Sequence, residues 1–134
     1  MNQTTRHSVF IVDDDADDRE SIRDAFLENK HHQEYVFMKN GDQLMGHFAD
    51  SVAKKHPALI LLDLNMPGKD GRDVLREMKR NDALKPIPIV VITTSSSERD
   101  RDISYQLGAN CFVTKPDSYQ ELVELTDSIA KLWL

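Results

Sequence analysis

The sequence of 134 residues lacks the features that several protein classes require. It has a single cysteine, Cys111, so an internal disulfide cannot form, and a reducing cytoplasmic location is expected. No apolar run approaches the roughly 20 residues of a membrane-spanning helix, and residues 1–7 contain no apolar signal segment. Acidic residues outnumber basic ones by 23 to 17, and the net charge of -6 argues against a nucleic-acid or anionic-membrane surface.

Five short apolar runs predict β-strands, and a helical pattern follows each of them. Most of the runs are continuous rather than alternating, which is typical of parallel strands buried on both faces. Strand followed by helix five times predicts an α/β fold, a doubly wound five-stranded parallel sheet in the order 2-1-3-4-5 with five helices. The predicted strands are 9–12, 35–38, 59–62, 89–92 and 111–114, and the helices lie at about 16–28, 44–52, 74–78, 98–107 and 118–134.

Side chains that could bind a metal or take part in catalysis follow four of the five predicted strands. Asp13 and Asp14 follow the first strand, Asp63 the third, Thr93 the fourth and Lys115 the fifth. In open parallel sheets, ligands bind outside the carboxyl ends of the strands. Because strands 1, 3, 4 and 5 are neighbours in the predicted order, we expect these five side chains to converge at one edge of the sheet.

The three aspartates predict a magnesium site. Neighbouring carboxylates cannot all remain ionised without compensation, and Mg²⁺ prefers oxygen ligands of this kind. A carboxylate, Mg²⁺, a hydroxyl and an ammonium are what phosphoryl transfer onto an aspartate requires. The carboxylate attacks, while the other groups neutralise or hydrogen-bond the phosphoryl oxygens.

Other acidic residues near the first strand have a simpler interpretation. Asp15, Asp17 and Asp18 lie where a helix begins, so we expect them to cap that helix or favour its N-terminal dipole. The sequence has no glycine-rich phosphate loop, so the phosphoryl donor is not expected to be a nucleotide bound at this edge.

The order and spacing of four stretches are informative when the stretches are taken together. They are residues 9–15, 61–71, 91–94 and 108–116. With them, the sequence resembles the receiver domain of two-component response regulators. The resemblance implies a flavodoxin-like receiver fold for residues 8–134, preceded by a flexible tail at residues 1–7. It also implies a single-domain response regulator without an output domain, which acts in a phosphorelay through protein contacts.

The resemblance implies roles for the acidic residues. Asp63 would be the phosphoacceptor. Asp14 would bind Mg²⁺ directly, and Asp13 would bind it directly or through water. Asp63 and the backbone carbonyl of Asn65 would complete the ligand set from the protein.

Further roles follow for residues at the ends of the last two strands. Thr93 and Lys115 would contact the phosphoryl oxygens, and Thr93 would also couple phosphorylation to the rest of the domain. Phe112 matches the aromatic switch position, and the Lys115–Pro116 peptide bond is expected to be cis. A cis bond would turn the chain sharply and direct Lys115 towards the site.

The end of the chain resembles a narrower group, the stand-alone regulators of bacterial phytochrome-type sensor kinases. This resemblance rests on 107–110, 128–134 and the loop 80–88, and it implies a sensor histidine kinase as partner, of phytochrome type or another. The apolar positions of the last helix span a wide arc, with Leu125 and Leu132 expected to face outward. We therefore expect a homodimer through the fourth helix, the fifth strand and the fifth helix, or else chain-end residues that fold back over the domain.

Two alternative functions remain open at this point. One is a phosphatase enzyme that works through an aspartyl-phosphate. It is disfavoured because Asn65 stands where such an enzyme has its general acid. The other is a pseudo-receiver, a binding module that is not phosphorylated. The leading interpretation is not an enzyme but a phosphoacceptor domain with at most self-catalysed phosphorylation and dephosphorylation.

Overall fold

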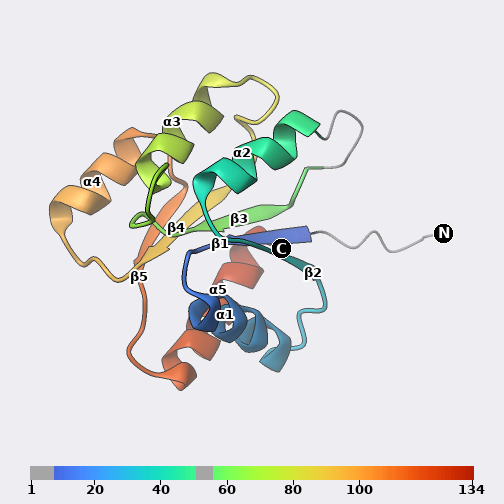
Figure 1. The fold of residues 1–134 in the computed structure, drawn as a ribbon. Helices are drawn as coiled ribbons and strands as arrows, with labels where there is room; N and C mark the ends of the chain where they lie inside the picture. The colour runs from blue at the N-terminus through green and yellow to red at the C-terminus, as the bar shows by residue number, and fades with distance from the viewer. Residues whose placement is uncertain (1–7, 51–55) are drawn as a thin grey trace.

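The computed structural model describes residues 8–50 and 56–134, and it has the predicted architecture. A five-stranded parallel sheet runs in the order β2-β1-β3-β4-β5. Helices α2, α3 and α4 cover one face, and α1 and α5 cover the other (Figure 1). The elements are β1 (Ser8–Val12), α1 (Ala16–Glu28), β2 (Glu34–Met38), α2 (Gly41–Asp50), β3 (Leu59–Leu62), α3 (Gly71–Arg80), β4 (Ile89–Thr93), α4 (Glu98–Gln106), β5 (Cys111–Thr114) and α5 (Tyr119–Trp133).

Two sequence-based expectations fall on residues outside those ranges. The predicted tail, residues 1–7, is one of them, and the end of the second predicted helix at Val52 is the other. None of the helices within 8–50 and 56–134 has the length and apolar character needed to cross a membrane.

Alternation along the strands divides the core into two layers, one on each face of the sheet. Successive side chains of a strand point to opposite faces. Phe10 and Leu62 therefore pack in the layer under α2, α3 and α4, whereas Ile11 and Leu61 pack in the layer against α1 and α5. Burial on both faces explains why β3 and β4 read as continuous apolar runs.

Polar caps start most of the helices soon after a strand ends. In each case a side-chain oxygen accepts a hydrogen bond from a backbone N–H of the first helical turn, which stabilises the helix start by about 1 kcal/mol. The caps are Asp15 for α1, Asp70 for α3, Ser97 for α4 and Ser118 for α5. The predicted capping role of Asp15 is therefore confirmed.

The apolar arc of α5 is more deeply covered than predicted. Leu125 packs against the core instead of facing outward, because it lies three residues after Leu122 and four before Ile129, on the same helical stripe. Leu132 does face solvent, with 73% of its surface exposed. The expected outward pair is therefore wrong for Leu125 and holds for Leu132.

Gly71 lets α3 begin directly behind the end of β3. A Cβ atom at this position would lie 2.6 Å from the backbone oxygen of Asp63 and 2.7 Å from the Cα atom of Leu64. Backbone atoms cannot move aside as a flexible side chain can, so Gly71→Ala should lower the free energy of unfolding by about 1–3 kcal/mol.

Urea denaturation checks this expectation, with Gly46→Ala as the matched control. Gly46 lies within α2, and no heavy atom comes within 4 Å of a Cβ built there. Alanine at Gly46 should therefore be neutral or stabilising. Equal stability of Gly71→Ala and the wild-type protein would show that the β3–α3 connection is not tightly packed.

Candidate functional site

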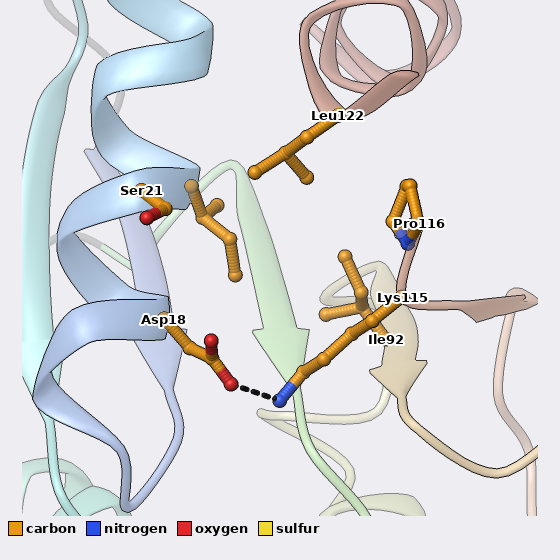
Figure 2. A pocket seen from close by; sticks show the side chains of 7 residues that line it. Asp18, Ser21, Ile92, Lys115, Pro116 and Leu122 are labelled. Carbon is orange, nitrogen blue, oxygen red and sulfur yellow. Dashed lines mark hydrogen bonds and ion pairs between the residues drawn. The ribbon is translucent and has the colours of Figure 1, made fainter. Parts of the chain in front are cut away.

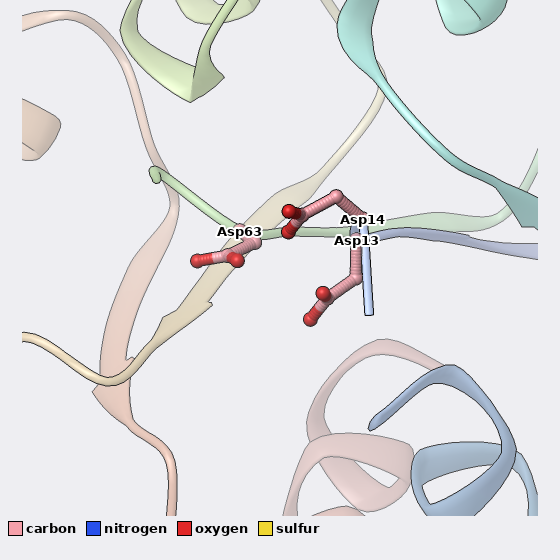
Figure 3. Close-up of side chains that lie close together, drawn as sticks. All are labelled: Asp13, Asp14 and Asp63. Carbon is pink, nitrogen blue, oxygen red and sulfur yellow. The ribbon is translucent and has the colours of Figure 1, made fainter. Parts of the chain in front are cut away.

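Three carboxylates gather at the carboxyl ends of β1 and β3. Oxygens of Asp13, Asp14 and Asp63 lie within 4.8 Å of one another, with Asp13 and Asp63 buried and Asp14 exposed (Figure 3). The backbone fixes the two buried residues, because Asp13 N–H donates to Met38 O and Asp63 N–H donates to Val12 O, both at 3.0 Å. The structure thus brings together the three aspartates singled out in the sequence.

Burial makes the negative charges of this cluster costly. It raises the pKa of the Asp63 carboxyl, and the nearby Lys115 ammonium and the Asn65 N–H oppose the shift only in part. Burial also raises the pKa of the Asp13 carboxyl, although Lys115 and the Asp15 N–H donate hydrogen bonds to it. An all-oxygen cluster whose negative charge is only partly compensated fits a hard divalent cation. Of the residues in the cluster, the three carboxylates would hold it.

Lys115 and Thr93 join the cluster from β5 and β4. The Lys115 N–H donates to Thr93 O at 2.6 Å, and its Nζ donates to Asp13 Oδ2 at 2.8 Å and lies 3.7 Å from Asp63 Oδ2. Burial alone would lower the pKa of Lys115, but the hydrogen bonds to carboxylates and their charges outweigh it and raise that pKa. Lys115 is therefore a stable ammonium beside Asp63.

Thr93 and Asn65 flank Asp63 on other sides. The Thr93 side chain is fully buried, and its hydroxyl accepts a hydrogen bond from the Asn65 side-chain amide at 3.4 Å. The Asn65 N–H donates to Asp63 Oδ1 at 3.3 Å. Asp63 is thus a carboxylate with an ammonium and a hydroxyl close by, an arrangement suited to nucleophilic attack on an anionic group.

The Lys115–Pro116 peptide bond is trans, and the described residues contain no cis peptide bond. The expectation of a cis bond is therefore wrong. With the trans bond, the Lys115 backbone still pairs with Thr93 and its ammonium still contacts Asp13. A sharper turn is not needed to reach the site, and the trans form of an X–Pro bond is favoured by about 0.5–1 kcal/mol.

Phe112 lies inside the domain, under α4. Its ring belongs to the core layer on that side of the sheet, and the Arg101 guanidinium lies 6.0 Å from the ring centroid. The Phe112 N–H donates to the Tyr105 hydroxyl at 3.1 Å. The predicted switch residue is therefore in contact with α4 at both its ring and its backbone.

Two residues of α1 reach the site without having been predicted to do so. Arg19 is buried, and its guanidinium donates to the backbone oxygen of Asp13 at 2.6 Å. Asp18 was assigned to the helix start, yet its carboxylate accepts a hydrogen bond from Lys115 at 2.8 Å. Their helical position was visible in the sequence, since both lie one turn after Asp15. Their contacts depend on the fold.

The site residues and the fold can be compared with known proteins. Residues 9–127 match the family model of the response regulator receiver domain. The response regulator Rcp1 of Synechocystis sp. is 36% identical over 132 residues, which cover 94% of this chain and 88% of that protein.

Solved structures agree with the sequence comparison. The phosphorylated cyanobacterial phytochrome response regulator RcpA is 36% identical and has a TM-score of 0.88, with 96% of this chain and 94% of that chain covered. The Mn²⁺-bound form of Rcp1 is also 36% identical and has a TM-score of 0.83 over the same shares of the two chains. The chain therefore belongs to the response regulator receiver domain family.

Proposed function

We propose that this receiver domain accepts a phosphoryl group on Asp63, with Mg²⁺ bound, from a sensor histidine kinase, and that it signals by protein contacts. The observation that carries the proposal is the position of Asp63. Its buried carboxylate lies within 4.8 Å of the Asp13 and Asp14 carboxylates and 3.7 Å from the Lys115 ammonium. Acceptor, metal-binding groups and charge-neutralising groups are therefore in one place.

Each of these residues has a separate role in the proposed transfer step. An Asp63 oxygen attacks the phosphorus of a phosphohistidine, the new O–P bond forms, and the N–P bond breaks with its electron pair leaving on the imidazole nitrogen. The Lys115 ammonium neutralises charge on the phosphoryl oxygens, and the Thr93 hydroxyl donates to one of them. Asp13, Asp14 and Asp63, with the Asn65 carbonyl, would hold Mg²⁺, which would supply further positive charge to the same oxygens.

The kinase partner is proposed from the relatives. RcpA is described as a phytochrome response regulator, and this chain matches it over 96% of its length. A phytochrome-type kinase is therefore the first partner to test, followed by other sensor histidine kinases.

Acetyl phosphate, a small phosphoryl donor, tests the proposal without the kinase. Incubation with acetyl phosphate and Mg²⁺ should add the mass of one phosphoryl group to the intact protein, and a chelator should prevent the addition. No added mass would favour the pseudo-receiver. Rapid turnover of a small phosphoester would favour the phosphatase.

We also propose self-association through α4, β5 and α5. Two of the elements in this proposed contact carry a large apolar side chain open to solvent, Leu132 on α5 and Tyr105 on α4, and exposed apolar surface often marks an interaction site. Because Leu125 is partly buried against the core, Leu132→Glu is the appropriate disrupting change. Sedimentation should show a dimer at micromolar concentration for the wild-type protein and a monomer for Leu132→Glu. A wild-type monomer, with and without phosphorylation, would overturn self-association.

A further inference from the structure

Lys115 has a second carboxylate partner, Asp18, which the transfer step described above does not use. The Lys115 Nζ donates to Asp18 Oδ2 and to Asp13 Oδ2, each at 2.8 Å. The distance to Asp63 Oδ2 is 3.7 Å, too long for a hydrogen bond. Figure 2 shows Lys115 reaching from the end of β5 to meet Asp18 on α1. The ammonium is thus bonded to two carboxylates other than the proposed acceptor.

The two partners of Lys115 differ in their exposure to solvent. The Asp13 side chain is 2% exposed and that of Lys115 is 15%, whereas that of Asp18 is 41% exposed. A buried ion pair is costly to separate, but an exposed carboxylate can return to water at little cost. Asp18 is therefore the partner that Lys115 can release most easily.

The stem of Lys115 lies at the edge of a small, largely apolar pocket. Lys115, Asp18, Ile92, Pro116 and Leu122 line one small pocket between α1, β4 and α5 (Figure 2). Apolar side chains on this side can accommodate the methylene stem. A small movement of the stem in that pocket would carry the ammonium from Asp18 towards Asp63.

Helix capping does not account for the Asp18 side chain. The cap of α1 is Asp15, whose carboxylate accepts from the Asp18 N–H at 3.1 Å. Asp18 contributes only its backbone to that contact, while its carboxylate pairs with Lys115. The side chain of Asp18 is therefore available for another role.

We propose that Asp18 is a positioning residue that competes with the phosphoryl group on Asp63 for the Lys115 ammonium. Asp13, Asp18 and Asp63 share this ammonium, and a phosphoryl group brings further negative charge to the same place. Asp18 must give up its ion pair when Lys115 turns to the phosphoryl oxygens, so it slows formation of the phosphorylated state. This role rests on the proposed function of Asp63.

Asp18→Asn tests the competition, with Asp17→Asn as the matched control. Both changes remove one negative charge from the first turn of α1, but Asp17 is exposed to solvent and is not among the carboxylates that lie near the Lys115 ammonium. With acetyl phosphate and Mg²⁺, intact mass should show phosphorylation about two- to fivefold faster in Asp18→Asn. Asp17→Asn should remain near the wild-type rate, and Asp18→Glu should restore the wild-type rate.

The outcomes separate this role from the function on which it rests. An equal rate for the two asparagine variants would mean that only the loss of charge matters, and a slower rate in Asp18→Asn would mean that Asp18 assists transfer. Either result overturns the competition while Asp63 remains the acceptor. Absence of phosphoryl uptake by the wild-type protein would instead overturn the proposed function itself.

A spectroscopic readout tests the contact without phosphorylation or metal. The Lys115 side-chain ammonium should give its own NMR signal in the unphosphorylated protein, because hydrogen bonds to carboxylates protect it from exchange. Asp18→Asn should shift that signal, and Asp17→Asn should leave it in place. An unchanged signal in Asp18→Asn would overturn the contact on which the competition depends.

Discussion

Asp63→Asn should take up no phosphoryl group from acetyl phosphate and Mg²⁺, under conditions in which the wild-type protein is phosphorylated. The amide has nearly the same shape as the carboxylate, but it is neutral and a poor nucleophile. Intact mass measures the difference, and circular dichroism should show an unchanged fold. Asp17 is an exposed residue outside the carboxylate cluster, so Asp17→Asn should be phosphorylated like the wild-type protein. Equal uptake by Asp63→Asn and the wild-type protein would remove Asp63 as the acceptor.

The same variant should be more stable than the wild-type protein at pH 7 without metal. Burial raises the pKa of the Asp63 carboxyl above its ordinary value, so folded-state stability falls as the pH rises from the ordinary pKa of aspartate to that raised pKa, and the loss is complete above it. Asparagine cannot ionise and avoids this cost. The advantage should shrink as the pH falls from the raised pKa towards about 4, the ordinary value for aspartate, and it should be absent below that value, because the wild-type carboxyl is then neutral in both states. Urea denaturation at the two pH values, with a chelator present, checks this expectation.

Asp14→Ala should weaken Mg²⁺ binding by at least about tenfold. Loss even of a group that only supports a metal ligand costs roughly 10–100-fold in affinity, and here one of three clustered carboxylates is removed. The variant should still fold, because Asp14 is exposed while Asp13 keeps its hydrogen bonds to Lys115 and the Asp15 N–H. Calorimetric titration with Mg²⁺ measures the affinity.

Asp17→Ala provides the control for charge alone. It removes the same charge a few residues along the chain, and its side chain is outside the cluster. Its Mg²⁺ affinity should stay close to that of the wild-type protein. An Asp14→Ala variant that binds as tightly as Asp17→Ala would contradict the proposed ligand set.

Much of the fold follows from short-range patterns and one topological rule. Continuous apolar runs such as 59–62 and 89–92 indicate strands buried on both faces. Asp13 and Asp63 directly follow two such runs, and the strand order predicts that they lie side by side. Local hydrogen-bonding chemistry also placed the start of α1 at Asp15. The convergence of the carboxylates was predictable because a parallel sheet aligns its carboxyl ends.

The unpredicted features depend on contacts between distant parts of the chain. Asp18 pairs with Lys115, which lies 97 positions away in the sequence. Neighbouring residues alone indicated only a role for Asp18 at the start of a helix. Leu125 lies at the edge of the apolar arc of α5. The burial of a side chain at that edge depends on how α5 packs against the sheet. The bond before Pro116 is trans, and the Lys115 ammonium contacts Asp13 without a cis turn.

Mapping the phosphorylated residue is the most direct test of Asp63 as the acceptor. The wild-type protein, phosphorylated with acetyl phosphate and Mg²⁺, is reduced with borohydride, which converts an aspartyl-phosphate to homoserine. Peptide mass spectrometry then locates the converted residue. Homoserine at position 63 and at no other aspartate is the predicted result. Homoserine at Asp13, Asp14 or Asp18, with Asp63 unchanged, would contradict it.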